Sequence, residues 1–407
     1  MDPRGKQGRH KLGTLCLTLL FFLAGCESEL PPSEAPTPPV APPPLSRHRP
    51  APPQEKPPSQ WINREPELPL VGFLLPLTGE HAALGKVLLN AGLLAFSELG
   101  VDNCCVRVLD TQGTATGARD AAQALMREGV KLVMGPLFTH EVQAVAPIFY
   151  RARVPVLAFS NNPKAWQKGV FLLGLSPKDE ITTLLAFGFS KPSQRFLALL
   201  PDGAYGEIVL QMINRSFAER QKHLLAATAQ APLPRLEVIR YRPGEMQAEE
   251  LRECCAATSF DAAIVLEQDL STAASFVEVL RKCQSSALIF GPSSWGDSAF
   301  ATRPELEGAY LAVPTQGDDA PLRKRYRQAF SGELLFPLGL FASDAVSILA
   351  RIPDFSRLTS QWFEQEESFL GASGEFCFEK NGQARRTLRV CQLKGGALVP
   401  VASAPLP

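Results

Sequence analysis

The chain has 407 residues, of which 45% are hydrophobic and 20% are charged, so it holds enough apolar material for a sizeable core. Lys and Arg together number 41, as do Asp and Glu, and this zero net charge gives no reason to expect nucleic acid or an anionic membrane as a partner. Because single cores stop growing near about 250–300 residues, we expect the globular part to divide into two lobes.

An export signal is expected at the N-terminus. Basic residues precede a largely apolar stretch over residues 12–24. This stretch is too short to span a bilayer, which needs about 20 apolar residues, but it is typical of a signal peptide. Residues 23–26 read Leu-Ala-Gly-Cys and resemble the lipobox of bacterial lipoproteins. The resemblance implies that residues 1–25 are removed and that Cys26 carries the lipid.

A proline-rich segment follows the lipidation site. From residue 26 to residue 66 the chain is rich in proline, above all between residues 31 and 58. Such a segment buries too little surface to offset its ordering entropy, and proline favours extended polyproline II, so we expect a disordered tether. Glu27 follows the lipidated cysteine, which by resemblance to enterobacterial sorting favours the outer membrane. We therefore expect a lipid-anchored protein that faces the periplasm, with the membrane as a partner through its anchor.

Beyond residue 68, short apolar runs alternate with longer amphipathic segments. This alternation predicts parallel sheets covered by helices on both faces. The first series predicts strands at 70–76, 106–110, 131–136 and 154–159, and helices at 82–99, 116–128 and 141–151. The second series predicts strands at 196–200, 236–240, 262–266 and 287–290, and helices at 206–220, 248–258 and 272–283.

The C-terminal part breaks the alternation. Strands at 374–378 and 387–391 flank an Asn381-Gly382 turn, which predicts a β-hairpin. The fold class that we expect is α/β, with two doubly wound parallel-sheet lobes, a central crevice and a C-terminal β-hairpin. The two-lobed domain covers residues 67–402. Its expected division is a first lobe at about 67–185 and 308–352 and a second lobe at about 186–307 and 353–402.

Several of these segments resemble one family. Residues 71–79 read Val-Gly-Phe-Leu-Leu-Pro-Leu-Thr-Gly and resemble the first strand and loop of type I periplasmic binding proteins, the leucine/isoleucine/valine-binding group. The likeness covers roughly residues 68–402. Residues 135–161 and 172–177 are most similar to the branch that contains the lipoprotein activators of penicillin-binding proteins. The enterobacterial activators also carry a large helical N-terminal domain, to which the resemblance does not extend.

Polar residues that follow the predicted strands are the candidate ligand-binding residues. Open α/β folds bind ligands at the carboxyl ends of their strands. The candidates are Thr139, Ser160 and Asn161 in the first lobe, and Tyr205, Gln268 and Ser293 in the second. In the amino-acid binders that the chain resembles, groups at the first-lobe positions hold the ligand's carboxylate. A structural role is the alternative for each, because Ser, Thr and Asn after strands commonly cap helices or form turns.

Motifs of common enzymes are absent from the sequence. It contains no His-Glu-x-x-His, Gly-x-Ser-x-Gly or Walker motif, and no Cys-x-x-Cys pair. The glycines at 113 and 117 follow a predicted strand but lack the spacing of a dinucleotide-binding loop. We therefore expect a binding protein rather than an enzyme, with no catalytic residues, no metal, no cofactor and no nucleic-acid partner.

The resemblance implies two alternative functions. The favoured one is an envelope-anchored regulator of peptidoglycan synthesis, with a penicillin-binding synthase as partner and a small-molecule ligand in the crevice. The alternative is the solute-binding component of an ABC importer for amino acids or related small molecules. After Gly291-Pro292, amino-acid binders of this type place an acid that pairs with the ligand's ammonium, and this chain has Ser293. Because a buried ammonium needs a partner, we expect a free α-amino acid to be a poor ligand.

Seven of the nine cysteines follow Cys26, and in an exported protein such residues can pair. Cys377 and Cys391 flank the predicted hairpin turn on facing strands, so they are the disulfide candidate. The other pairing considered is Cys283 with Cys254 or Cys255, on adjacent helices. The remaining alternative is that these residues are free thiols, which behave as small hydrophobic side chains.

Overall fold

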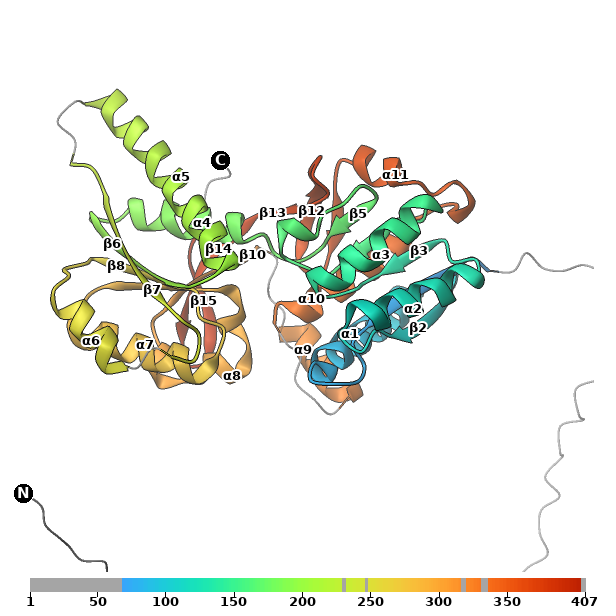
Figure 1. Cartoon of the computed structure of the whole chain (residues 1–407), viewed down its shortest axis with the longest axis horizontal. Coiled ribbons are helices and arrows are strands. Elements are labelled where there is room, and N and C mark those ends of the chain that lie inside the picture. Colours follow the sequence, from blue (N-terminus) through green and yellow to red (C-terminus); the bar gives the residue numbers. More distant parts are fainter. Residues whose placement is uncertain (1–67, 229–231, 246–247, 316–319, 331–335, 404–407) are drawn as a thin grey trace, which may run out of the picture. The chain divides into compact units, whose positions relative to one another are not determined.

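The structure, a computed structural model, describes residues 68–228, 232–245, 248–315, 320–330 and 336–403. These residues form a five-stranded, a seven-stranded and a three-stranded sheet with helices packed around them (Figure 1). All three sheets belong to one compact unit, Glu65–Pro407.

The five-stranded sheet is parallel throughout and has the strand order β2-β1-β3-β4-β5. Its strands are β1 (Leu70–Leu75), β2 (Cys105–Asp110), β3 (Leu132–Met134), β4 (Val156–Ala158) and β5 (Val170–Leu172). The connecting helices are α1 (Ala82–Leu99), α2 (Ala115–Arg127), α3 (Thr139–Arg151) and the short 3-10 helix η2 (Pro163–Ala165). This is the β-α alternation that the sequence predicts.

Alternate residues of β1 pack on opposite faces of this sheet. Val71, Phe73 and Leu75 belong to the core that includes α1 and α10 (Leu338–Ala350), whereas Leu74 belongs to the core formed with α2 and α3. All four side chains are fully buried. A strand that is buried on both faces must be apolar at every position, which is why β1 appears in the sequence as a continuous apolar run.

Helix α1 is the one helix among the described residues that is long and apolar enough to cross a membrane. It packs against β1, α10 and α9 (Ala320–Phe330), and Leu88 and Ala91 on its inner face are fully buried. The core helices of water-soluble domains have this same length and composition. In this structure α1 is one of the layers that cover the first sheet.

The seven-stranded sheet is mixed and has the strand order β15-β14-β10-β9-β8-β6-β7. Its parallel strands are β6 (Arg195–Pro201), β7 (Arg235–Tyr241), β8 (Ala262–Val265), β9 (Leu288–Gly291) and β10 (Tyr310–Pro314). The antiparallel strands β14 (Leu388–Lys394) and β15 (Ala397–Ser403) extend it beyond β10. Its helices are α4 (Pro177–Phe189), α5 (Ala204–Ala227), α6 (Ala248–Ala256), α7 (Leu270–Cys283), η3 (Ser293–Gly296), α8 (Ser298–Ala301) and η4 (Pro304–Leu306).

The third sheet adjoins the first. It consists of β11 (Phe369–Gly371), β12 (Gly374–Phe378) and β13 (Ala384–Arg386), preceded by η5 (Phe355–Arg357) and α11 (Ser360–Gln365). Strand β11 packs against α10, and a β-bridge joins Leu172 of β5 to Gln383. The first lobe consists of the five-stranded sheet with its helices, the three-stranded sheet, η5 and helices α9–α11. The second lobe consists of the seven-stranded sheet with its helices.

The chain crosses between the lobes at places that differ from the expected boundaries. The sequence predicts residues 308–352 in the first lobe, but β10 lies in the middle of the second sheet. It predicts residues 353–402 in the second lobe, but β11, β12 and β13 pack on the first. Helix α4, expected in the first lobe, packs against α5 and β10. An apolar run indicates that a strand is buried, but it does not indicate which sheet the strand joins.

The expected C-terminal hairpin is only partly correct. Strand β12 pairs with β13 across the Asn381-Gly382 turn, but the chain leaves this sheet after Arg386, and β14 pairs with β10 and β15. Cys377 therefore lies opposite Arg385, and Cys391 lies in the other sheet opposite Leu311. Both thiols are free. The predicted Cys377–Cys391 disulfide is wrong, because its premise of facing strands fails.

Candidate functional site

A pocket of about 560 Å³ lies between the two lobes. Its lining comes from segments that follow β3, β4 and β5 in the first lobe and β6, β7, β8 and β9 in the second. The six residues selected from the sequence all line it: Thr139, Ser160, Asn161, Tyr205, Gln268 and Ser293. The carboxyl ends of parallel strands thus bring together side chains that are far apart in the chain.

The first-lobe wall offers neutral hydrogen-bonding groups. Thr139 begins α3 and Ser160 follows β4, and their hydroxyl oxygens lie 3.5 Å apart. The backbone N–H of Asn162 donates to Ser160 Oγ at 3.3 Å. Gly174 lets the segment after β5 pass directly behind this wall, because a Cβ there would lie 2.5 Å from the carbonyl oxygen of Ser160. The backbone that carries Ser160 is therefore held by close packing against the segment after β5.

The three candidate residues of the second-lobe wall lie where a helix begins or a strand ends. Tyr205 lies in the first turn of α5, Gln268 follows β8, and Ser293 begins η3. Helix α5 begins directly against the end of β6, because residue 206 is glycine and a Cβ there would lie 1.9 Å from the carbonyl oxygen of Pro201. This close start keeps the phenol of Tyr205 at the pocket.

Two glutamates also line the pocket. Glu180, in the first turn of α4, is buried and accepts a hydrogen bond from the backbone N–H of Ser293 at 2.8 Å. Glu267, which follows β8, accepts a hydrogen bond from the hydroxyl of Tyr241 at 2.7 Å. Its other carboxylate oxygen accepts from the two following backbone N–H groups at 2.7 Å each. Each acid is therefore fixed in orientation by the protein.

Burial dominates the acid–base chemistry of this wall. It raises the pKa of Glu180 to about 7, against the opposing effect of the hydrogen bonds from Ser293, and the neighbouring Asp179 raises it further. Burial also raises the pKa of Asp179 to about 6. The pKa of Tyr205 is raised by burial and by the nearby Glu180. Near neutral pH, Glu180 is therefore balanced between its neutral and its charged form.

Neither glutamate is among the residues selected from the sequence. The residue after Gly291-Pro292 is Ser293 rather than an acid, but the structure brings Glu180 to Ser293 from 113 positions away. The pocket therefore contains a carboxyl group beside Ser293, and the expectation that a free α-amino acid is a poor ligand stays a prediction. A signal was present in the sequence, because Glu180 and the buried Leu184 are four residues apart on one helix face. An acid on an apolar face indicates a specific partner or a site.

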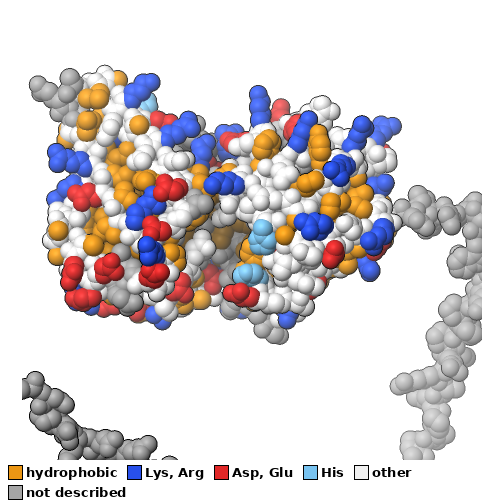
Figure 2. Space-filling view, in the orientation of Figure 1, with side chains coloured by type: hydrophobic (Ala, Val, Ile, Leu, Met, Phe, Trp, Pro, Cys, Tyr) orange, Lys and Arg blue, Asp and Glu red, His pale blue; other side chains and the backbone are white. Residues whose placement is uncertain are grey.

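The exposed face in Figure 2 carries acidic and basic side chains side by side, around a hollow between the lobes. Such mixing produces no field of one sign over that face. Within the described part of the chain, no group of three or more His, Cys, Asp or Glu residues is arranged to hold a metal ion. The pocket is thus suited to binding by hydrogen bonds, aromatic contacts and carboxyl groups.

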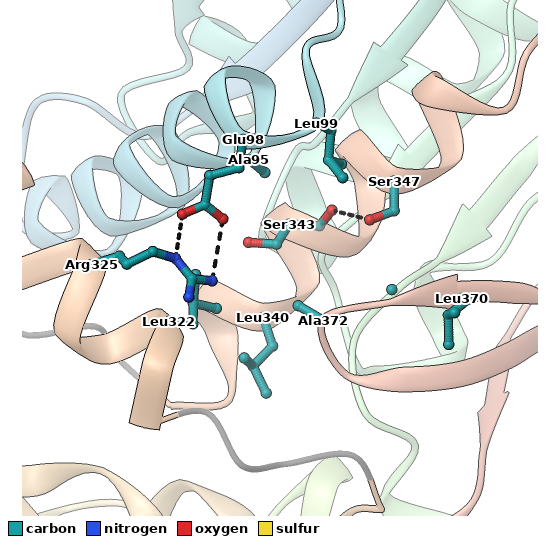
Figure 3. Close-up of a pocket in the computed structure, with 11 residues that line it drawn as sticks. Ala95, Glu98, Leu99, Leu322, Arg325, Leu340, Ser343, Ser347, Leu370 and Ala372 are labelled. Atoms are coloured by element: carbon teal, nitrogen blue, oxygen red, sulfur yellow. Dashed lines mark hydrogen bonds and ion pairs between the residues drawn. The ribbon is translucent and has the colours of Figure 1, made fainter.

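A second pocket, of about 330 Å³, lies in the first lobe between α1, α9, α10 and β11 (Figure 3). The carboxylate of Glu98 and the guanidinium of Arg325 form an ion pair at its edge. Inside α10, the hydroxyl of Ser347 donates to the carbonyl of Ser343 at 3.0 Å. These polar groups are partnered within the protein, and none of the residues selected from the sequence lies here.

Two lobes with a ligand-sized pocket at their strand ends define a binding protein of the α/β class. Residues 70–332 match the family described as periplasmic binding protein, which is more than half of the chain. The chain belongs to the periplasmic binding protein family.

Solved structures share this fold. The leucine-binding protein from Thermotoga maritima has a TM-score of 0.63 and 18% identity, over 82% of this chain and 98% of that one. The C-domain of LpoA from Haemophilus influenzae has a TM-score of 0.61 and 19% identity, over 82% of this chain and all (100%) of that one. At these identities the likeness concerns the fold, and it confirms the predicted two-lobed α/β architecture.

Curated relatives match over a shorter segment. The penicillin-binding protein activator LpoA of Vibrio cholerae is 27% identical over 161 residues, which is 38% of this chain and 26% of that protein. An uncharacterised protein of Rickettsia prowazekii is 20% identical over 157 residues, or 41% of its own length. The match therefore spans less than half of either relative. These relatives and structures include binding proteins and a regulator, in keeping with an envelope location.

Proposed function

We propose that the chain is an envelope-anchored lipoprotein that regulates peptidoglycan synthesis by contact with a penicillin-binding synthase. The observation that carries this proposal is the double likeness to the LpoA activators, in sequence to the Vibrio protein and in fold to the Haemophilus C-domain. The Haemophilus protein is described as a regulator of PBP1A. An α/β binding domain fits regulation by contact.

The membrane anchor is part of the proposal. The signal peptide at residues 1–25, the lipidated Cys26 and the tether to residue 66 lie outside the described residues, so their support is the sequence order of basic, apolar and small residues before a cysteine. A lipid at Cys26 would hold the domain at the outer membrane, facing the periplasm. The proline-rich tether would give it reach toward a synthase.

The inter-lobe pocket has a regulatory role in this proposal. Thr139, Ser160 and Asn161 from one lobe and Tyr205, Gln268 and Ser293 from the other would contact one ligand. A ligand that contacts both lobes at once stabilises only the arrangement in which the two walls face each other. Ligand binding would in that way alter the surface presented to the synthase.

A reconstituted synthase reaction tests the regulatory function. The purified lipid-anchored chain is added to a bifunctional penicillin-binding synthase of the same bacterium, and the rates of glycan polymerisation and peptide cross-linking are measured. We expect a several-fold rise in rate that saturates with the concentration of the chain. A leucine-binding protein of the same fold serves as control and should leave the rates unchanged. Unchanged rates with the chain itself would contradict the proposal.

A solute receptor of an ABC importer is the second candidate, favoured by the convergence of polar side chains from both lobes on one pocket. Calorimetry against the twenty amino acids separates the two functions. A ligand at 100 times its dissociation constant adds about 2.7 kcal/mol to stability, which a thermal shift also detects. Micromolar binding that Tyr205→Ala abolishes, together with neighbouring permease and ATPase genes, would favour the importer.

A further inference from the structure

The ionisable groups that line the inter-lobe pocket are all acids, which are neutral or negatively charged. They are the carboxyls of Glu180 and Glu267 and the phenols of Tyr205 and Tyr241. Among the lining residues that the structure describes, there is no Lys, Arg or His. The pocket therefore carries negative charge or none, and it has no fixed positive charge to offer a ligand.

Glu180 is the group whose charge lacks a partner. It is 9% exposed, and its hydrogen bond comes from a neutral donor, the N–H of Ser293. Over the described ranges, no ion pair to Glu180 is formed. A buried carboxylate without a positive partner is costly, so burial disfavours the charged form of Glu180 and a cation beside it would favour that form. Glu180 nevertheless is one of the residues that line the pocket.

The remaining walls suit the apolar body of a ligand. Aromatic side chains from both lobes line the pocket: Phe138, Phe159, Tyr205, Tyr241 and Phe341. Contact with them buries apolar ligand surface. The hydroxyl groups of Thr139 and Ser160 on the first-lobe wall are neutral. They suit an uncharged oxygen or N–H group of the same ligand.

We propose that the pocket selects ligands that carry a positively charged amino group, and that the carboxylate of Glu180 is the counter-charge for that group. The inference rests on the ligand-binding role of the pocket in the proposed function, and it adds the chemical class of the ligand. A ligand whose only charge is a carboxylate would face two glutamates and no cation. Such acids are therefore disfavoured.

Matched ligand sets test the selectivity. Benzylamine, benzyl alcohol and benzoate share one ring, and 3-methylbutylamine, 3-methylbutanol and 4-methylpentanoate share one aliphatic body. Binding of each to the purified chain is measured by calorimetry at pH 7. Since a hydrogen bond to a charged group contributes about 1.5–3 kcal/mol, each amine should bind at least about tenfold more tightly than its matched acid. An acid that binds as tightly as its matched amine, or failure of both amines to bind, would overturn the proposal.

Substitution of the acid tests its role. In Glu180→Gln the preference for amines should disappear, while the amide oxygen can still accept the hydrogen bond from Ser293. Glu219→Gln is the matched control, because Glu219 is exposed, pairs with Arg215 on α5 and does not line this pocket. Thermal unfolding of both variants establishes that they fold. A preference for amines that survives in Glu180→Gln contradicts the assignment.

Proton release gives a readout that a purely structural Glu180 would not produce. At pH 6, below its pKa of about 7, the free carboxyl is mostly protonated, and an ammonium group beside it favours the charged form. Amine binding should therefore release a proton, seen as a difference in heat between buffers of low and high ionisation enthalpy. The ionisable groups coupled to Glu180 are Asp179 and Tyr205. Release should persist in Asp179→Asn and vanish in Glu180→Gln, and the opposite pattern would refute the proposal.

The test of amine selectivity is independent of the synthase assay. Loss of synthase stimulation with amine selectivity intact would reject the regulatory function but keep the pocket assignment. Stimulation without amine selectivity would reject the pocket assignment alone.

Discussion

At the scale of single residues, a buried ion pair joins α10 to the third sheet. The guanidinium of Arg386 lies between the rings of Phe341 and Phe376, at 4.7 and 4.8 Å from their centroids. It donates to Asp344 Oδ2 at 3.1 Å and to Ser373 Oγ at 2.8 Å. Both charged side chains are fully buried. Breaking such a pair leaves an uncompensated charge in the interior.

We therefore expect Arg386→Met to lower the free energy of unfolding by about 3–5 kcal/mol. The double variant Asp344→Leu with Arg386→Met should lose less than the sum of the two single variants, because no buried charge remains. Urea denaturation measures all three. Arg215→Met is the control, since its pair with Glu219 is exposed and should contribute under about 1 kcal/mol. Equal losses in Arg386→Met and Arg215→Met would contradict this account.

The acids of α4 predict how stability depends on pH. The pKa values of Glu180 and Asp179 are raised by burial to about 7 and about 6, so the folded protein retains these protons to higher pH than the unfolded chain. Their contribution is therefore fully present below pH 4 and is lost as the pH rises through 6 and 7. Each unit of pKa difference corresponds to about 1.4 kcal/mol.

Glu180→Gln should make the free energy of unfolding less dependent on pH between 5 and 7, because the amide has no proton to lose. The measurement is urea denaturation at pH 5, 6 and 7, with Asp179→Asn studied in parallel. Asp179→Asn should also reduce the slope, but at the lower end of this range. A slope in Glu180→Gln equal to that of the unmodified chain would show that Glu180 does not titrate as proposed.

At the scale of elements, α6 and α7 bring two cysteines together. Cys255 is buried on the face of α6 that also carries Leu251, and Cys283 ends α7 on the face that carries Phe276 and Leu280. Burial is the main cause that raises the pKa of Cys255 to about 12, and the nearby thiol of Cys283 raises it further. Cys254 is exposed, so the pairing considered from the sequence narrows to Cys255 with Cys283.

We expect these two thiols to form a disulfide when the chain is exported to an oxidising compartment. The bond would form by exchange with the disulfide of an oxidoreductase, which leaves as a dithiol. Alkylation of the unfolded protein without reduction, followed by peptide mass spectrometry, is the measurement. Peptides of Cys255 and Cys283 should be recovered linked, whereas the buried Cys391, on β14, should be recovered alkylated. Full alkylation of Cys255 without reduction would exclude the bond.

At the scale of the whole molecule, the proposed lipid anchor would determine where the domain works. We expect residues 1–25 to be removed and Cys26 to become the lipidated N-terminus, so Cys26→Ala should accumulate as an unlipidated precursor. Metabolic labelling with a palmitate analogue and fractionation of inner and outer membranes are the measurements. Cys16→Ala, inside the signal peptide, is the control and should leave lipidation intact. Unlabelled wild-type protein in the soluble periplasm would reject the anchor.

Much of the fold and part of the site followed from the sequence alone. Runs such as residues 70–75 are apolar at every position because both faces of the sheet are covered, and this determines the α/β class before any contact is known. Thr139, Ser160 and Ser293 could be selected because residues after parallel strands gather at one edge whatever the details of packing. Local pattern was sufficient for both conclusions.

Only the tertiary structure decided which segments became partners. An apolar pattern reports burial but not the identity of the neighbour, so it could not reveal that β14 leaves β12 and joins β10, which separates Cys377 from Cys391. For the same reason it could not place Glu180 against Ser293, since that contact depends on α4 crossing to the second lobe. The charge of the pocket was therefore decided by long-range packing, whereas its location was already determined by the order of strands and helices.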